Sequence, residues 1–207
     1  MNRPMPPLSL LELSDMGDFG SRVTPAPEVW KWLQTEILAD TGTIHNEDHA
    51  HLLDADIRIM WASSSFEKQG RTVLGQTEQV AFRAGGWQKA RMEQQMRDWF
   101  GDVPAFIITL AADYCADCSD ADFCALVEHE LFHIAQELDQ YGAPKFTKEG
   151  APKLCIRGHD VEEFVGVVRR YGASKDVQQM VEVANGSPEV SKASIARSCG
   201  TCIRGVA

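Results

Sequence analysis

Basic residues are scarce in this sequence, and the shortage limits the possible functions. The 207 residues include 20 Lys and Arg against 30 Asp and Glu, which gives a net charge of −10. Nucleic-acid-binding proteins need clustered Lys and Arg to contact phosphates. The adjacent Arg169 and Arg170 are too small a cluster to supply them. The composition therefore argues against a nucleic-acid partner.

Long apolar runs are also missing. No stretch approaches the roughly 20 apolar residues that a membrane-spanning helix needs. The N-terminal region has one basic residue, Arg3, and its apolar stretch at 8–13 is short and interrupted by Glu12. This is not the pattern of a secretory signal. We therefore expect a cytosolic protein with no membrane partner.

Cysteine is absent before position 115, and six cysteines follow. In a cytosolic chain this uneven spacing suggests metal binding or packing before disulfides. Two C-x-x-C pairs together have the ligand set of a tetrahedral structural zinc site: Cys115 with Cys118, and Cys199 with Cys202. A redox role for the CGTC pair and partly buried thiols without metal are the alternatives. We interpret the remaining two, Cys124 and Cys155, as packing residues.

The rest of the composition is that of a globular protein, with 44% hydrophobic and 24% charged residues. Apolar spacing predicts helices at 28–39, 87–100, 119–138, 160–171 and 174–184. It predicts strands at 56–63 and 105–112, with 71–80 as a hairpin partner of the first. This order favours an α+β fold, a small mixed or antiparallel sheet packed against helices.

We expect three regions along the chain. Residues 1–25 form an N-terminal arm, residues 26–184 form a single domain, and residues 185–207 form a C-terminal tail, with its CGTC, that packs on the domain.

The sequence HELFH, residues 129–133, carries the clearest chemical signal. His129 and His133 are four residues apart on a predicted helix, so both imidazoles lie on one face and can reach one zinc ion. Glu130 can take the proton of a water whose pKa the zinc has lowered. The alternative is a helix with two hydrogen-bonded core histidines, but burying these polar groups without a purpose would be costly.

A catalytic zinc needs a third protein ligand. His159 is the only histidine after the motif, and on a helix it would share a polar face with Glu163. We predict His159 as the ligand and Glu163 as its neighbour in the site, although the two roles can be exchanged. Asp160 is a candidate for orienting a ligand histidine. A solvated helix face is the alternative interpretation.

The other three histidines, His45, His49 and His51, cluster in the N-terminal third of the chain. They could bind metal adventitiously, but their spacing fits no common site. A polar helix start is the favoured interpretation.

Two blocks carry a family resemblance, ALVEHELFHIAQELDQYGAPKF (125–146) and RGHDVEEFVGVVRRYG (157–172). They resemble the metallopeptidases encoded by bacteriophages and prophages, and the similarity extends over most of the chain after about residue 28. The resemblance implies a zincin-like domain in a bacterial host cell. It also implies zinc held by His129, His133 and a residue of the HDVEEF block, a pattern compatible with His159, with Glu130 as the base.

We therefore expect a zinc metallopeptidase that hydrolyses a protein or peptide, with one catalytic zinc and a possible second, structural one. A protease for DNA-bound proteins fits the acidic composition less well. The alternative outside enzymes is a zinc-binding phage protein that serves as a regulator or binds a partner. The sequence predicts neither the substrate nor the oligomeric state.

Overall fold

The computed structural model describes residues 2–14, 21–68, 70–161, 165–190, 193 and 199–201. Its centre is a four-stranded sheet in the order β1-β2-β6-β5. These strands are β1 (Val23–Pro25), β2 (Ile57–Ala62), β5 (Gly75–Gln79) and β6 (Phe106–Ala111). Strand β6 is parallel to β2 and antiparallel to β5, and β1 is antiparallel to β2.

The apolar run at 105–112 is confirmed as a buried strand. Strand β6 lies between β2 and β5, and five of its six residues are buried. An apolar side chain on both faces suits a strand that is covered on both sides. The expectation of a strand at 56–63 is also confirmed, as β2.

The predicted hairpin between 56–63 and 71–80 is wrong. Strand β6 takes the place beside β2, so β5 pairs with β6 instead. The hairpin that does form is smaller and joins β3 (Phe66–Lys68) to β4 (Arg71–Val73). The more apolar β6 pairs with β2 over all six of its residues, which buries more surface than the polar β5 could.

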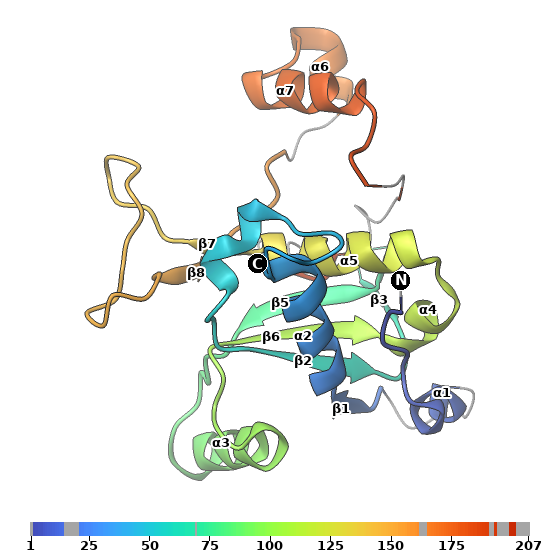
Figure 1. Cartoon of the computed structure of the whole chain (residues 1–207), viewed down its shortest axis with the longest axis vertical. Helices are drawn as coiled ribbons and strands as arrows, with labels where there is room; N and C mark the ends of the chain where they lie inside the picture. The colour runs from blue at the N-terminus through green and yellow to red at the C-terminus, as the bar shows by residue number, and fades with distance from the viewer. Residues whose placement is uncertain are drawn as a thin grey trace.

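Helices cover the sheet and close the core (Figure 1). Helix α2 (Pro27–Leu33) continues as a π-helical turn, η1 (Gln34–Leu38), and packs on β2. Helix α4 (Ala112–Asp117) leads directly into α5 (Asp120–Phe132), which packs against β5. Trp61 of β2 and Phe123 of α5 are fully buried where these layers meet. This confirms the α+β class.

Helix α5 ends six residues earlier than predicted. After Phe132 the chain becomes strand β7 (Ile134–Gln136), which pairs antiparallel with β8 (Leu154–Ile156). Ile134 is buried in the core, and its pairing with Ile156 outweighs the helical periodicity of the sequence. The helix end therefore falls at His133.

The remaining helices add few residues to the core, Leu10 and Leu52 among them. Helix α1 (Leu8–Ser14) packs near α4, η2 (Glu47–Leu52) is a 3-10 helix, and α3 (Gly86–Phe100) has no buried residue. Helices α6 (Val165–Tyr171) and α7 (Lys175–Ala184) form a pair that stands away from the sheet (Figure 1). No helix in the described part of the chain is long and apolar enough to cross a membrane.

Candidate metal centre

Helix α5 presents the HELFH residues beside the sheet. Its N-terminus is capped by Ser119, whose hydroxyl accepts a hydrogen bond from Asp122 N at 3.1 Å. The apolar residues Leu126, Val127 and Leu131 anchor it in the core. This packing fixes the rotation of the last helical turns and directs His129, Glu130 and His133 toward strand β5 and the residues that follow β8.

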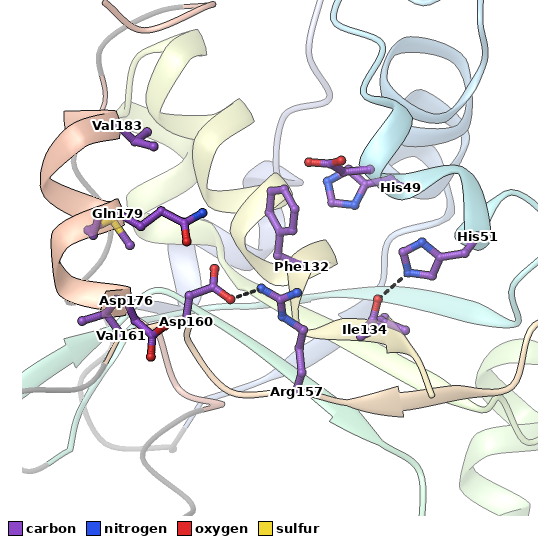
Figure 2. Close-up of a pocket in the computed structure, with 13 residues that line it drawn as sticks. His49, His51, Phe132, Ile134, Arg157, Asp160, Val161, Asp176, Gln179 and Val183 are labelled. Atoms are coloured by element: carbon purple, nitrogen blue, oxygen red, sulfur yellow. Dashed lines mark hydrogen bonds and ion pairs between the residues drawn. The ribbon is translucent and has the colours of Figure 1, made fainter. Parts of the chain in front are cut away.

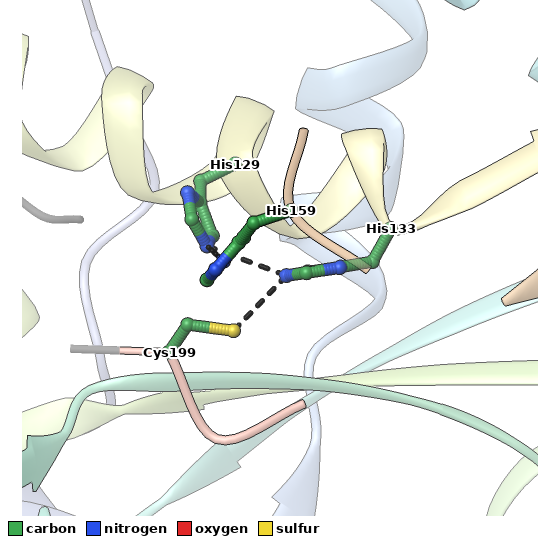
Figure 3. A group of neighbouring side chains, drawn as sticks. All are labelled: His129, His133, His159 and Cys199. Atoms are coloured by element: carbon green, nitrogen blue, oxygen red, sulfur yellow. Dashed lines mark hydrogen bonds between the residues drawn. The ribbon is translucent and has the colours of Figure 1, made fainter. Parts of the chain in front are cut away.

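Three histidines converge at this end of α5 (Figure 3). His129 Nε2 lies 3.3 Å from His133 Nε2 and 3.0 Å from His159 Nε2. The Sγ atom of Cys199 lies 3.0 Å from His133 Nε2. All four ligand atoms lie within 4.8 Å of one another, the one such group of His, Cys, Asp and Glu found among the described residues.

This donor set fits zinc. Three imidazoles and a thiolate are ligands that Zn²⁺ prefers, in a tetrahedral arrangement. With Zn–N bonds of about 2.0–2.1 Å, tetrahedral nitrogens are about 3.3 Å apart, close to the separations of the imidazoles. The arrangement could therefore hold one metal ion.

The orientation of His133 is set by the backbone. Its Nδ1 donates to the carbonyl oxygen of Arg157 at 2.9 Å, which turns Nε2 toward the other two histidines. A backbone acceptor on the far nitrogen is the usual support of a metal-binding histidine. Burial lowers the pKa of His133, but the hydrogen bonds with Cys199 and Arg157 outweigh it, so the pKa is raised overall.

Glu130 is fully buried next to the histidines. Its Oε2 accepts a hydrogen bond from the hydroxyl of Thr77 at 2.8 Å, whereas Oε1 has no hydrogen-bond partner among the described residues. Burial and the nearby Cys199 thiolate raise the pKa of Glu130 to about 8. A buried carboxylate with one oxygen unused is suited to accept a proton.

Gly75 leaves room for this carboxylate. A Cβ atom at position 75 would lie 2.7 Å from Glu130 Oε1 and 3.0 Å from Leu126 Cδ1. Any larger residue would therefore push the Glu130 side chain out of its place.

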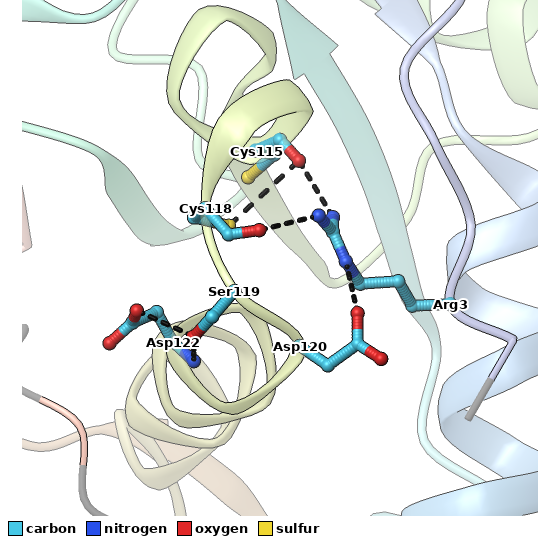
Figure 4. Close-up of polar contacts among 6 residues, drawn as sticks. All are labelled: Arg3, Cys115, Cys118, Ser119, Asp120 and Asp122. Carbon is cyan, nitrogen blue, oxygen red and sulfur yellow. Dashed lines mark hydrogen bonds and ion pairs between the residues drawn. The ribbon is translucent and has the colours of Figure 1, made fainter.

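The four-cysteine zinc site is not assembled in the described part of the chain. Cys199 lies with the histidines, whereas Cys115 and Cys118 lie in and just after α4, and Cys202 is outside the described residues. The hydrogen bond with Cys118 and burial raise the pKa of Cys115. The guanidinium of Arg3 binds the carbonyl oxygens of both cysteines, at 2.6 and 2.7 Å (Figure 4). The pair therefore anchors the N-terminal segment.

The predicted helix around His159 is also corrected. His159 lies in an irregular segment after β8, before α6 begins at Val165, so it reaches the cluster from a loop. Glu163 is outside the described residues. Asp160 pairs with Arg157 rather than with a histidine of the cluster.

The three earlier histidines do not join the cluster. His49 and His51 belong to η2, whose start is capped by the side chain of Asn46, in line with the polar helix start that we favoured. His49 is buried and packs against the ring of Phe132 in a tilted arrangement, with centroids 4.4 Å apart. The ring of His51 is 2.8 Å from the carbonyl oxygen of Ile134.

A pocket of about 750 Å³ lies beside residues 157–161, the segment that carries His159 (Figure 2). The Arg157–Asp160 ion pair forms one side, His49 and His51 form another, and α7 contributes Met180 and Val183.

Sequence reasoning missed three members of this site. The sequence groups Cys199 with Cys115 and Cys118, which lie elsewhere, and with Cys202, which is outside the described residues, and it gives no signal for Thr77 and Gly75 of β5. The single signal available was the position of Cys199 in a CGTC pair at the end of the chain. The contacts of Gly75 and Thr77 with Glu130 become visible only when β5 is placed against α5 in the structure.

Comparison with known proteins adds one finding. A family model described as "putative phage metallopeptidase" matches residues 30–185. This range includes the whole of α5, the β7–β8 pair and His159. No curated protein and no solved structure matches the chain.

Proposed function

The chain belongs to the phage metallopeptidase family, and on that premise we propose that it is a zinc-dependent peptidase whose metal ligands include His129, His133 and His159. The observation that carries the proposal is the meeting of three imidazole nitrogens beside a buried glutamate. A structural histidine cluster would have no need of a carboxylate with one unused oxygen at its edge.

Each residue has a chemical role in this proposal. Zinc on the three imidazoles would polarise the scissile carbonyl group and lower the pKa of a bound water. Glu130 takes the proton of the attacking water and returns it to the leaving amide nitrogen. The hydroxyl of Thr77 holds Oε2 of Glu130, so the other oxygen is the one that receives the proton. The carbonyl of Arg157 keeps His133 in the tautomer that binds through Nε2.

The substrate in this proposal is a peptide bond of a phage or host protein, cleaved in the cytoplasm of the bacterial host. Strand β5 is an edge strand of the sheet beside α5, and an extended peptide can add to such an edge. Its backbone then lies along the cluster.

Metal content tests the ligands. Purified wild-type protein, offered zinc, is expected to hold about one zinc per chain by elemental analysis, and His133→Ala is expected to hold clearly less after dialysis, because it loses one ligand of the cluster. The control is His45→Ala, because His45 lies outside the cluster and should leave the zinc content unchanged. A wild-type protein without zinc would contradict the proposal.

Activity tests the base. Glu130→Gln keeps the size of the side chain but removes the proton acceptor, so hydrolysis of an unfolded protein such as casein should be lost while zinc is retained. The matched control is Glu128→Gln on the same helix, whose side chain accepts a hydrogen bond from Asn46 and lies outside the proton path. Equal activity in wild type and Glu130→Gln would overturn the assigned role.

One observation favours the non-enzymatic alternative. Cys199 would complete a set of four protein ligands, and closed four-ligand zinc sites are usually structural. A zinc-containing protein in which no variant hydrolyses a peptide would support that function.

A further inference from the structure

We propose that Cys199–Thr201 form a removable plug of the active site, with the Cys199 thiolate as fourth metal ligand. This inference rests on the proposed function and concerns its regulation. The plug segment, as we call residues 199–201, holds the peptidase latent until it leaves.

The first step concerns the ligand position. Cys199 is 4% exposed, and its Sγ lies 3.0 Å from His133 Nε2. The backbone N–H of Thr201 also points at this sulfur, at 3.3 Å. A hydrogen bond from a backbone amide stabilises the thiolate, the form that binds metal. The sulfur therefore occupies the fourth coordination position, the one that the three histidines do not fill.

The second step concerns the substrate edge. Cys199 forms a parallel β-bridge with Gly75, and Gly200 N donates to Gly75 O at 2.8 Å. Thr201 continues the contact, because its hydroxyl accepts from Thr77 N at 2.7 Å. These are the outward-facing backbone groups of β5, the ones that an added peptide strand would need. The plug segment takes the place of that strand.

The third step concerns the base. The hydroxyl of Thr201 is 3.4 Å from Oε2 of Glu130. Thr201 is 7% exposed and Glu130 is fully buried beneath it, so water has no direct route to the carboxylate. One short segment thus covers the ligand position, the substrate edge and the base together.

Gly200 allows this close approach. A Cβ at position 200 would lie 2.7 Å from Val73 Cγ1 and 3.0 Å from Gln76 Cβ. A branched residue there would force the plug segment away from β5. Gly200→Val should therefore displace the plug segment while leaving all three histidines unchanged.

A catalytic zinc site keeps one position open for water, whereas three histidines and a thiolate fill all four. While the plug segment is in place no water can be activated, so the basal hydrolysis of the wild type comes from the fraction of chains in which the segment has left. When the plug segment leaves, the three histidines retain the metal and the fourth position opens.

Cobalt spectroscopy tests the ligand. Cobalt-loaded wild type should show a thiolate-to-cobalt charge-transfer band, and Cys199→Ala should lose that band while still holding about one cobalt per chain on the three histidines. The matched control is Cys155→Ala in β8, which should keep both the band and the cobalt.

The outcomes separate the two proposals. Metal in the wild type without a charge-transfer band overturns the role of Cys199 and leaves the peptidase proposal standing. No metal in wild type or variant, by elemental analysis, overturns both. Loss of the band in Cys155→Ala as well would also count against Cys199 as the ligand.

Alkylation tests whether the plug is removable. Iodoacetamide forms a C–S bond with a reachable thiolate and releases iodide, and mass spectrometry locates the label. In the zinc-loaded wild type Cys199 should stay unlabelled. In zinc-loaded Gly200→Val it should be labelled, and casein hydrolysis should rise above the wild-type rate.

The control for this variant is Gly85→Val, where an added Cβ meets nothing within 4 Å. It should resemble the wild type in both measurements. Labelling of Cys199 in Gly200→Val without any gain in hydrolysis, in a protein that still holds zinc, would overturn the latent state. So would rapid labelling of Cys199 in the zinc-loaded wild type.

Discussion

Thr77 joins Glu130 to the plug segment, the first through its hydroxyl group and the second through its backbone. Its Oγ1 lies 2.8 Å from both the carbonyl oxygen and Oε2 of Glu130, and its backbone N–H donates to Thr201. Thr77 itself is 1% exposed, so no solvent replaces these contacts. A buried carboxyl that loses such a partner bears the full desolvation penalty.

Thr77→Val is therefore expected to lower the free energy of unfolding of the metal-free protein by about 1–3 kcal/mol. Urea unfolding measures the change. The control is Thr77→Ser, which keeps the hydroxyl and should lose clearly less. Equal losses in the two variants would mean that the methyl group, not the hydrogen bond, stabilises this position.

Some residues of the candidate site can be predicted from the sequence and others cannot. His129, Glu130 and His133 follow from a spacing within one helix turn, which a sequence displays directly. His159 was singled out as the one histidine after the motif, but its setting was wrong because the helix starts later. Cys199 meets His133 across 66 positions of chain, and no local pattern encodes that distance.

At the level of elements, Arg3 holds the N-terminal segment on α4 and α5. Its guanidinium donates to the carbonyl oxygens of Cys115 and Cys118 and to Asp120 Oδ1 (Figure 4). It also lies over the ring of Phe123, 5.0 Å from the centroid. The carbonyls at the end of α4 have no helical partners, so Arg3 satisfies them.

Arg3→Ala is expected to destabilise the protein by about 2 kcal/mol, the range of hydrogen bonds to charged groups. Thermal or urea unfolding would measure it, and zinc content should not change because the site lies at the other end of α5. Arg3→Lys should recover only part of the loss, since an ammonium group cannot reproduce the fork of the guanidinium. Full recovery by lysine would show that charge alone matters.

Elements were predicted well where local patterns decide them. The buried strand β6, the helix α3 and the helix α7 with its Ser174 cap follow from runs and caps in the sequence. The end of α5 and the pairing partner of β5 could not be predicted from local patterns, because both depend on strand pairing between distant segments. Helical periodicity continues past Phe132, but the pairing of Ile134 with Ile156 overrides it.

Across the whole molecule, the candidate metal site connects segments that lie far apart in the chain. Helix α5, the loop after β8 and the plug segment each contribute to one cluster. An ion bound only by the folded protein stabilises it by mass action.

Zinc at about 100 times its dissociation constant is therefore expected to raise the free energy of unfolding by about 2.7 kcal/mol. Urea unfolding with zinc and with a chelator gives the difference. His133→Ala should show a clearly smaller response, because it loses one ligand of the cluster. An equal response in that variant would place the stabilising metal elsewhere.

A metal ion held by both His159 and Cys199 would close the part of the chain between these two residues into a loop. When His159 and Cys199 share one ion, the chain between them, including the protruding pair α6 and α7, is tied at both ends. The thiolate is then a tethered ligand whose local concentration depends on the length of this loop. Because closure entropy grows slowly, doubling the loop would cost only about 0.6 kcal/mol. In the proposed plugged state, latency would therefore tolerate large changes in the length of α6 and α7, whereas an outward pull on this pair would act on the Cys199 ligand.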